Sequence, residues 1–332
     1  MCWIPTASEQ RPAHVVAASL KEHRDVGAWL GTIMTGLIMM TGLIIVSIYC
    51  LGDYGATIFF SAPVLLGAIC GYSHKQYDRT SNPGIAIAIS MAAVLLGCGV
   101  LIALALEGVV CILMAVPIML PAAAVGGLIG YFIASASQAG PSWMTIALLM
   151  PSAAIIEHAL TQPVQYEVVS VVEVDATPSE VWDTVIAFPK IDTPPDWLFR
   201  LGVAWPVSAR IEGQGVGAVR YCQFSTGDFV EPITTWQPPN HLAFSVEEQP
   251  CPLTELSPYE NIHPPHLDGF MRSHQGEFRL IELPGGRTRL EGHTWYSVDM
   301  YPQMYWKIWT DSIIHSIHHR VLGHIKNVVE AE

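Results

Sequence analysis

Charged residues are almost absent from the first half of the chain, and this is the feature that most restricts what the chain can fold into. Residues 1–163 contain five Lys and Arg and seven Asp and Glu, whereas residues 164–332 contain eleven and twenty-two. Uncharged runs fill 26–52, 54–74, 80–106 and 108–156. A helix crosses a bilayer with about 20 apolar residues, so the first three runs predict one span each and the longer fourth run predicts two.

We therefore expect an N-terminal tail at 1–25, a transmembrane region of about five helices at 26–161, and a water-soluble domain at 162–332. Such a chain is an integral membrane protein, and a bacterial inner membrane is the expected location. Glu107 is expected in the short turn between the third and fourth spans.

Orientation follows from the positions of Lys and Arg in short loops, which favour the cytoplasm. The tail contains Arg11, Lys21 and Arg24, and the second loop contains Lys75 and Arg79. Five spans then place the soluble domain outside the cytoplasm. If the run with its two prolines, at 117 and 121, re-enters instead of crossing, the domain lies inside.

The soluble half carries a net charge of −11. Nucleic-acid binding requires clustered Lys and Arg, so no nucleic-acid partner is expected. Cys222 and Cys251 are the only cysteines of this half, and they can pair only in an oxidising space. The glycine-rich "GQGVG" is followed by a strand rather than a helix, which predicts a hairpin turn and no nucleotide cofactor.

The hydrophobic pattern changes at residue 163. "VQYEVVSVVEVDA" alternates like a strand, and "TPSEVWDTVIAF" begins with Thr177, Pro178 and Glu180 in the arrangement of a helical capping box. Five or six antiparallel strands follow, interrupted by the insert "PCPLTELSPYENIHPPHLDG". A long helix is predicted at about 303–330.

Three segments of this half resemble a known superfamily. "VVEVDATPSEVWDTVIAF", "EGQGVGAVR" and "MYWKIWTDSIIHSIHHRVLGHIK" resemble the START-like superfamily (SRPBCC, polyketide cyclase/dehydrase and lipid transport) over roughly the last 170 residues. The resemblance implies an α+β helix-grip domain, following the α-helical transmembrane bundle, with an apolar cavity between a curved sheet and the final helix. Members bind lipids, sterols, polyketides or hormones, and a minority catalyse cyclisation or dehydration. The superfamily has no shared catalytic residues to carry over.

Strand alternation leaves open which faces line such a cavity. Arg289, Glu291 and His293 share one face, which we expect to be a solvated ladder of ion pairs. Arg220 and Glu231 form either a buried pair that orients a polar ligand end or, as we expect, a surface pair.

The final helix should turn one arc toward the sheet. That arc consists of Thr310, Ile314, Ile317, Val321, Ile325 and Val328, with His324 on its flank near the pocket. Asp311, His315 and His318 fall on a separate face, where solvent or a partner is expected rather than zinc, because no fourth ligand is evident.

The insert contains His263, His266 and Asp268, which we interpret as part of a lid or partner contact. No metal site is expected in the chain. The residues predicted to line the pocket are Trp182, Arg220, Phe224, Glu231, His293, Trp295, Ile317, Val321 and His324.

The favoured hypothesis is membrane-anchored binding or transfer of a hydrophobic, lipid-like small molecule, with membrane lipids and other membrane proteins as further partners. The first alternative is a structural subunit of a membrane complex, for which the aromatic segment "MYPQMYWKIW" would provide an exposed contact surface. The second alternative is an enzyme of the cyclase or dehydratase type, which is less expected because no motif defines a reaction.

Overall fold

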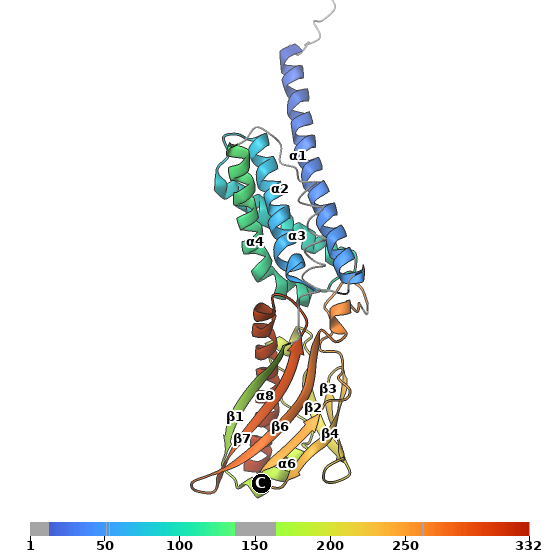
Figure 1. Cartoon of the computed structure of the whole chain (residues 1–332), viewed down its shortest axis with the longest axis vertical. Coiled ribbons are helices and arrows are strands. Elements are labelled where there is room, and N and C mark those ends of the chain that lie inside the picture. Colours follow the sequence, from blue (N-terminus) through green and yellow to red (C-terminus); the bar gives the residue numbers. More distant parts are fainter. Residues whose placement is uncertain (1–12, 51, 53, 137–163, 261, 332) are drawn as a thin grey trace, which may run out of the picture. The chain divides into compact units, whose positions relative to one another are not determined.

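The computed structural model describes residues 13–50, 52, 54–136, 164–260 and 262–331 (Figure 1). Within these residues the chain forms two compact units. The first holds most of the N-terminal helices, with the described residues 13–45, 60–99 and 116–136. The second holds 46–59, 100–115 and the C-terminal residues from 164 onward.

Four N-terminal helices are long and apolar enough to cross a membrane: Trp29–Cys50, Thr57–Tyr77, Pro83–Ala103 and Val109–Ala136. They comprise α1 (Ala13–Ile45) with η1 (Val46–Cys50), η2 (Thr57–Ser61) with α2 (Ala62–Tyr77), α3 (Pro83–Ala103) and α4 (Val109–Ala136). Pro117 and Pro121 lie inside α4, which remains one helix of 28 residues. The fifth predicted span lies outside the described residues.

Glycines allow α2 and α4 to approach each other closely. A Cβ atom on Gly126 would lie 2.0 Å from the carbonyl oxygen of Val64, and one on Gly130 would lie 2.0 Å from that of Ala68. Gly67 meets the carbonyl of Ala123 in the same way, at 2.2 Å. Because apolar side chains gain little by leaving lipid for a helix interface, such backbone contact is a main source of helix association.

The C-terminal unit is built on seven antiparallel strands in the order β1-β7-β6-β5-β4-β3-β2. Figure 1 shows them as a curved sheet beside the long helix α8. This is the predicted helix-grip fold. The strands are β1 (Gln165–Val174), β2 (Pro206–Glu212), β3 (Val219–Phe224), β4 (Gly227–Gln237), β5 (His241–Ser245), β6 (Met271–Leu283) and β7 (Arg287–Val298); the helices are α6 (Pro178–Ile186), α7 (Trp197–Arg200), η3 (Pro265–Leu267) and α8 (Gln303–Glu330).

The capping box predicted for α6 is present. The backbone N–H of Thr177 donates to Glu180 Oε2 at 2.7 Å, and Pro178 occupies the first turn of the helix. Val181 and Val185 of this helix are fully buried in a core that also contains Leu322 and Ile325 of α8. This short helix thus closes one end of the core between sheet and α8.

The buried face of α8 differs in part from the predicted arc. Thr310, Ile314, Val321 and Ile325 are buried as expected, but Val328 is half-buried and Val329 takes its place in the core. His318 is also buried, at 9% exposure, so the prediction that it faces solvent is wrong. The reason is that the sheet offers hydroxyl groups at this position, which can satisfy a buried imidazole.

The aromatic segment before and within α8 is not an exposed surface. Trp306 is 4% exposed, and its ring packs against Phe59 with a centroid distance of 4.9 Å. Tyr305 donates its hydroxyl to the carbonyl of Met114. The exposed apolar side chains of the segment are Met304 and Ile308.

Candidate functional site

A cavity of about 110 Å³ lies between the inner face of the sheet and α8. Its wall is mainly apolar, with aromatic rings from β3, β4, β5 and β6 opposite aliphatic side chains of α8. These apolar residues are Phe224, Phe229, Phe244, Phe278, Ile314, Ile317, Val321 and Leu322. A few polar groups interrupt this wall, which is the usual composition of a small-molecule site.

The first polar group is a buried ion pair. Arg220 of β3 and Glu231 of β4 are directly paired in the sheet register, and Nη1 of the arginine contacts Oε2 of the glutamate. Arg220 is 2% exposed and Glu231 is 6% exposed. The expectation of a surface pair is therefore wrong, because this face of β3 and β4 points into the core rather than toward water.

Aromatic rings and a carbonyl surround the guanidinium group. Nε of Arg220 donates to the carbonyl of Ile186 at 3.2 Å. The guanidinium carbon, Cζ, lies 5.4 Å from the ring centroid of Phe244 and 5.5 Å from that of Phe278. Burial alone would lower the pKa of Arg220, but the carboxylate of Glu231 and the nearby Cys222 together outweigh this effect and raise it. The arginine thus stays charged beside the cavity.

The second polar group is a chain of hydrogen bonds on the opposite wall. His318 Nε2 lies 2.8 Å from Thr294 Oγ1, and its Nδ1 lies 3.1 Å from Ser170 Oγ. Ser170 Oγ is in turn 2.7 Å from Nδ1 of His315. The chain runs from a cavity-lining residue to a half-buried imidazole on the next turn of α8.

The environment of His318 keeps its imidazole neutral. Burial, with smaller contributions from the neighbouring His315, His293 and His319, lowers the pKa of His318 to about 3. A neutral imidazole both donates and accepts a hydrogen bond, which suits its position between two hydroxyl groups.

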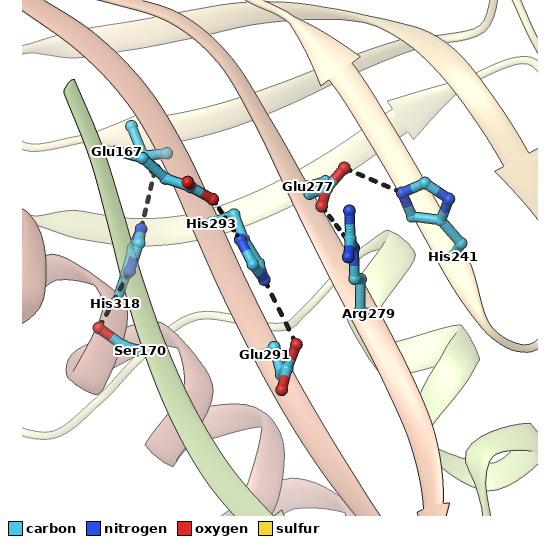
Figure 2. A network of polar contacts seen from close by, with 9 residues as sticks. Glu167, Ser170, His241, Glu277, Arg279, Glu291, His293 and His318 are labelled. Carbon is cyan, nitrogen blue, oxygen red and sulfur yellow. Dashed lines mark hydrogen bonds and ion pairs between the residues drawn. The ribbon is translucent and has the colours of Figure 1, made fainter. Parts of the chain in front are cut away.

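The outer face of the sheet carries a ladder of ion pairs that includes the predicted Arg289, Glu291 and His293, but the side chains of Glu291 and His293 are only 12% and 9% exposed, so the ladder is not solvated as expected. Figure 2 shows the imidazole of His293 between two carboxylates, at 2.9 Å from Glu167 and 3.4 Å from Glu291. On the neighbouring strand, Glu277 pairs with His241 and Arg279 in the same way (Figure 2). The ladder thus lies on the face opposite to that of Thr294, whose side chain meets α8.

Six of the nine predicted pocket residues border the cavity: Arg220, Phe224, Glu231, His293, Ile317 and Val321. The imidazole of His293, however, bonds to the outer ladder. Trp182 packs against Trp236 in the core, Trp295 stacks on His293, and Nε2 of His324 lies 3.0 Å from the carbonyl oxygen of Pro189. These three do not line the cavity.

The predicted set misses His318, Thr294 and the phenylalanines of β5 and β6. A signal for Phe278 was available, because Leu280 shares its face and marks it as apolar. Cys222, which also lines the cavity, and Cys251 are both free thiols, and burial, followed by the nearby Glu231, raises the pKa of Cys222 to about 12.

Comparison with protein-family models gives no match, and comparison with curated proteins gives none either. Among solved structures, the chain is similar to norcoclaurine synthase from Thalictrum flavum, with 13% identity, a TM-score of 0.34, and coverage of 52% of this chain and 98% of that one. It is also similar to the Zhui aromatase/cyclase from Streptomyces sp. R1128, with 15% identity, a TM-score of 0.35, and coverage of 50% and 94%.

The buried Arg220–Glu231 pair leads to a prediction about the free energy of unfolding. Arg220→Met leaves the Glu231 carboxylate buried without its partner, so we expect the free energy of unfolding to fall by about 3–5 kcal/mol. Adding Glu231→Leu to Arg220→Met should restore much of the loss. Thermal unfolding of the purified chain checks both, and Arg210→Met, which breaks an exposed pair with Glu212, is the control. Equal effects of the two arginine substitutions would contradict the assignment.

The buried imidazole of His318 leads to a prediction about how stability depends on pH. The folded chain holds this imidazole neutral down to about pH 3, whereas the unfolded chain protonates it below about pH 6.5, so its contribution to stability is complete above that value and is lost as the pH falls. Between about pH 6.5 and 5 the resulting loss of unfolding free energy approaches about 2 kcal/mol. We expect His318→Gln to reduce the slope of stability against pH, and the exposed His319→Gln to keep it.

Proposed function

We propose that the C-terminal domain binds a hydrophobic small molecule that carries one polar group. The observation that carries this proposal is the cavity itself, with aromatic and aliphatic side chains around a charged Arg220 and a neutral His318. Buried polar groups cost free energy unless they are paired. Their presence beside an apolar cavity favours recognition of a ligand over stability alone.

The size of the cavity restricts the ligand. Its volume of about 110 Å³ is below the range of about 300–1,000 Å³ for drug-sized ligands and is near that of engineered cavities which accept benzene. A single ring or a short acyl end fits without rearrangement. A whole lipid requires α8 or the insert to move away from the sheet.

We further propose that this domain faces the extracytoplasmic side of a membrane. Tyr54, in the turn after the first spanning helix, and Glu107, in the turn between the third and fourth, both lie 3.4 Å from Nδ1 of His266 in the insert. Two spans separate these turns, so they share one side. The loop with Arg79 lies on the other side, and Lys and Arg favour the cytoplasm.

Fusion proteins in a bacterial host test this orientation. We expect alkaline phosphatase fused after the last residue to be active, because it folds only outside the cytoplasm, and green fluorescent protein at the same position to be dark. Fusions placed after Tyr77 should give the reverse pattern. If green fluorescent protein at the C-terminus is fluorescent and alkaline phosphatase there is inactive, the domain lies in the cytoplasm and the proposed orientation is overturned.

Ligand binding is tested with a variant that fills the cavity. Ile317→Trp places an indole where the ligand would lie, whereas Val216→Trp adds the same group in an exposed turn. We expect mass spectrometry of solvent extracts to find a hydrophobic compound in wild-type and Val216→Trp protein, and at least tenfold less in Ile317→Trp.

A simple probe supports the same comparison if no natural ligand survives purification. p-Cresol has one ring and one hydroxyl group, and it should raise the melting temperature of wild-type protein by binding only the folded state. Ile317→Trp should not respond. The proposal fails if extracts of all three proteins are identical and p-cresol does not stabilise the wild type.

A further inference from the structure

A second group of chemically reactive side chains lies outside the cavity, where two distant segments of the C-terminal unit meet. Glu107 comes from the turn before α4, Cys111 from the first turn of α4, and His266 from η3 in the insert. One ligand atom from each of these residues lies within 4.8 Å of the other two. Sγ of Cys111 is 2.7 Å from Nε2 of His266, and Oε2 of Glu107 is 3.4 Å from Nδ1.

Glu255, from the other end of the insert, lies beside this group. Its side chain is fully buried, and Oε1 lies 3.8 Å from Nε2 of His266. The other oxygen, Oε2, accepts the backbone N–H of Val110 at 3.2 Å at the N-terminus of α4. Oε1 has no hydrogen-bond partner among the described residues.

Capping of α4 explains only part of this arrangement. A cap uses one carboxylate oxygen, whereas Oε1 of Glu255 turns toward the imidazole and thiol. The chain also makes room for this carboxylate, because a Cβ atom on Gly108 would lie 1.9 Å from Oε2. An unpartnered buried carboxylate oxygen is costly, and a bound cation removes that cost.

The charges of the cluster lead to the same conclusion. Glu107 and Glu255 have side-chain exposures of 8% and 0%, and within the described residues the ion-pair partner of both is His266. Two acidic side chains that converge on one imidazole in this way are donors that a divalent cation such as Zn²⁺ takes.

We propose that Glu107, Cys111, Glu255 and His266 bind one zinc ion. Thiolate, imidazole and carboxylate are the three ligand types that Zn²⁺ takes in proteins, and four protein ligands define a closed, structural site. Tyr54 supports it, because its hydroxyl donates to Oε1 of Glu107 at 2.9 Å and so orients that carboxylate. The ion joins both ends of the insert to the turn before α4.

His266 is the one histidine of this site, and the other histidines considered as metal ligands from the sequence have different partners. His263 pairs with Asp268 at 2.8 Å on an exposed part of the insert, and His315 and His318 bond to Ser170. Cys111 lies in the uncharged run 108–156, and a single cysteine in such a run gives no sign of its partners at 255 and 266.

The experiment measures metal in the full-length protein, purified in detergent with a tag that lacks histidine. After equilibration with zinc and dialysis, we expect inductively coupled plasma mass spectrometry to find about one zinc per chain. Cys111→Ser and Glu255→Gln should each retain less than about a tenth of this amount. His263→Gln alters the same insert without touching the site and should bind zinc like the wild type.

Cobalt provides a readout that does not depend on the folding of the variants. Co²⁺ added to the wild-type chain should give a near-ultraviolet thiolate-to-metal band, and this band should be absent when zinc is already bound. Wild-type protein that keeps no zinc and shows no such band overturns the proposal. Full zinc content in Cys111→Ser would also overturn it.

Discussion

The grip of the curved sheet on α8 is the interaction on which the rest of the C-terminal unit depends. Leu322 and Ile325 of the helix are completely buried against Leu242, Leu290 and other side chains of the sheet. Because α8 also supplies one wall of the cavity, the contacts that stabilise the fold and those that shape the cavity belong to a single helix. Burial of each such side chain contributes about 1.5–3 kcal/mol.

Two polar features interrupt this apolar interior, one on each side of the cavity. The Arg220–Glu231 pair belongs to β3 and β4, and the hydrogen bonds of His318 connect α8 to β1 and β7. Buried ion pairs are weak sources of stability, since desolvation offsets most of their attraction. Their placement at a cavity therefore gives the domain two distinct chemical surfaces there, one charged and one neutral.

Local periodicity and turn residues predicted the capping box and the limits of α8, and the family resemblance implied the helix-grip fold. The sequence did not predict the cavity wall fully. A bulge between Ser273 and Gln275 shifts the register of β6, so Ser273 and Gly276 both face inward although alternation separates them. The burial of His318 depends on hydroxyl groups about 148 and 24 residues away, which no local pattern reveals.

The cluster around His266 has a consequence for the order in which the protein is completed. Tyr54 precedes His266 by 212 residues, and Val110 precedes Glu255 by 145. During synthesis the turns between the N-terminal helices therefore emerge long before the residues that cover them. Tyr54 and Glu107 bond to each other, but their contacts with His266 form only when the insert has been made, so the last third of the chain finishes the structure of the first.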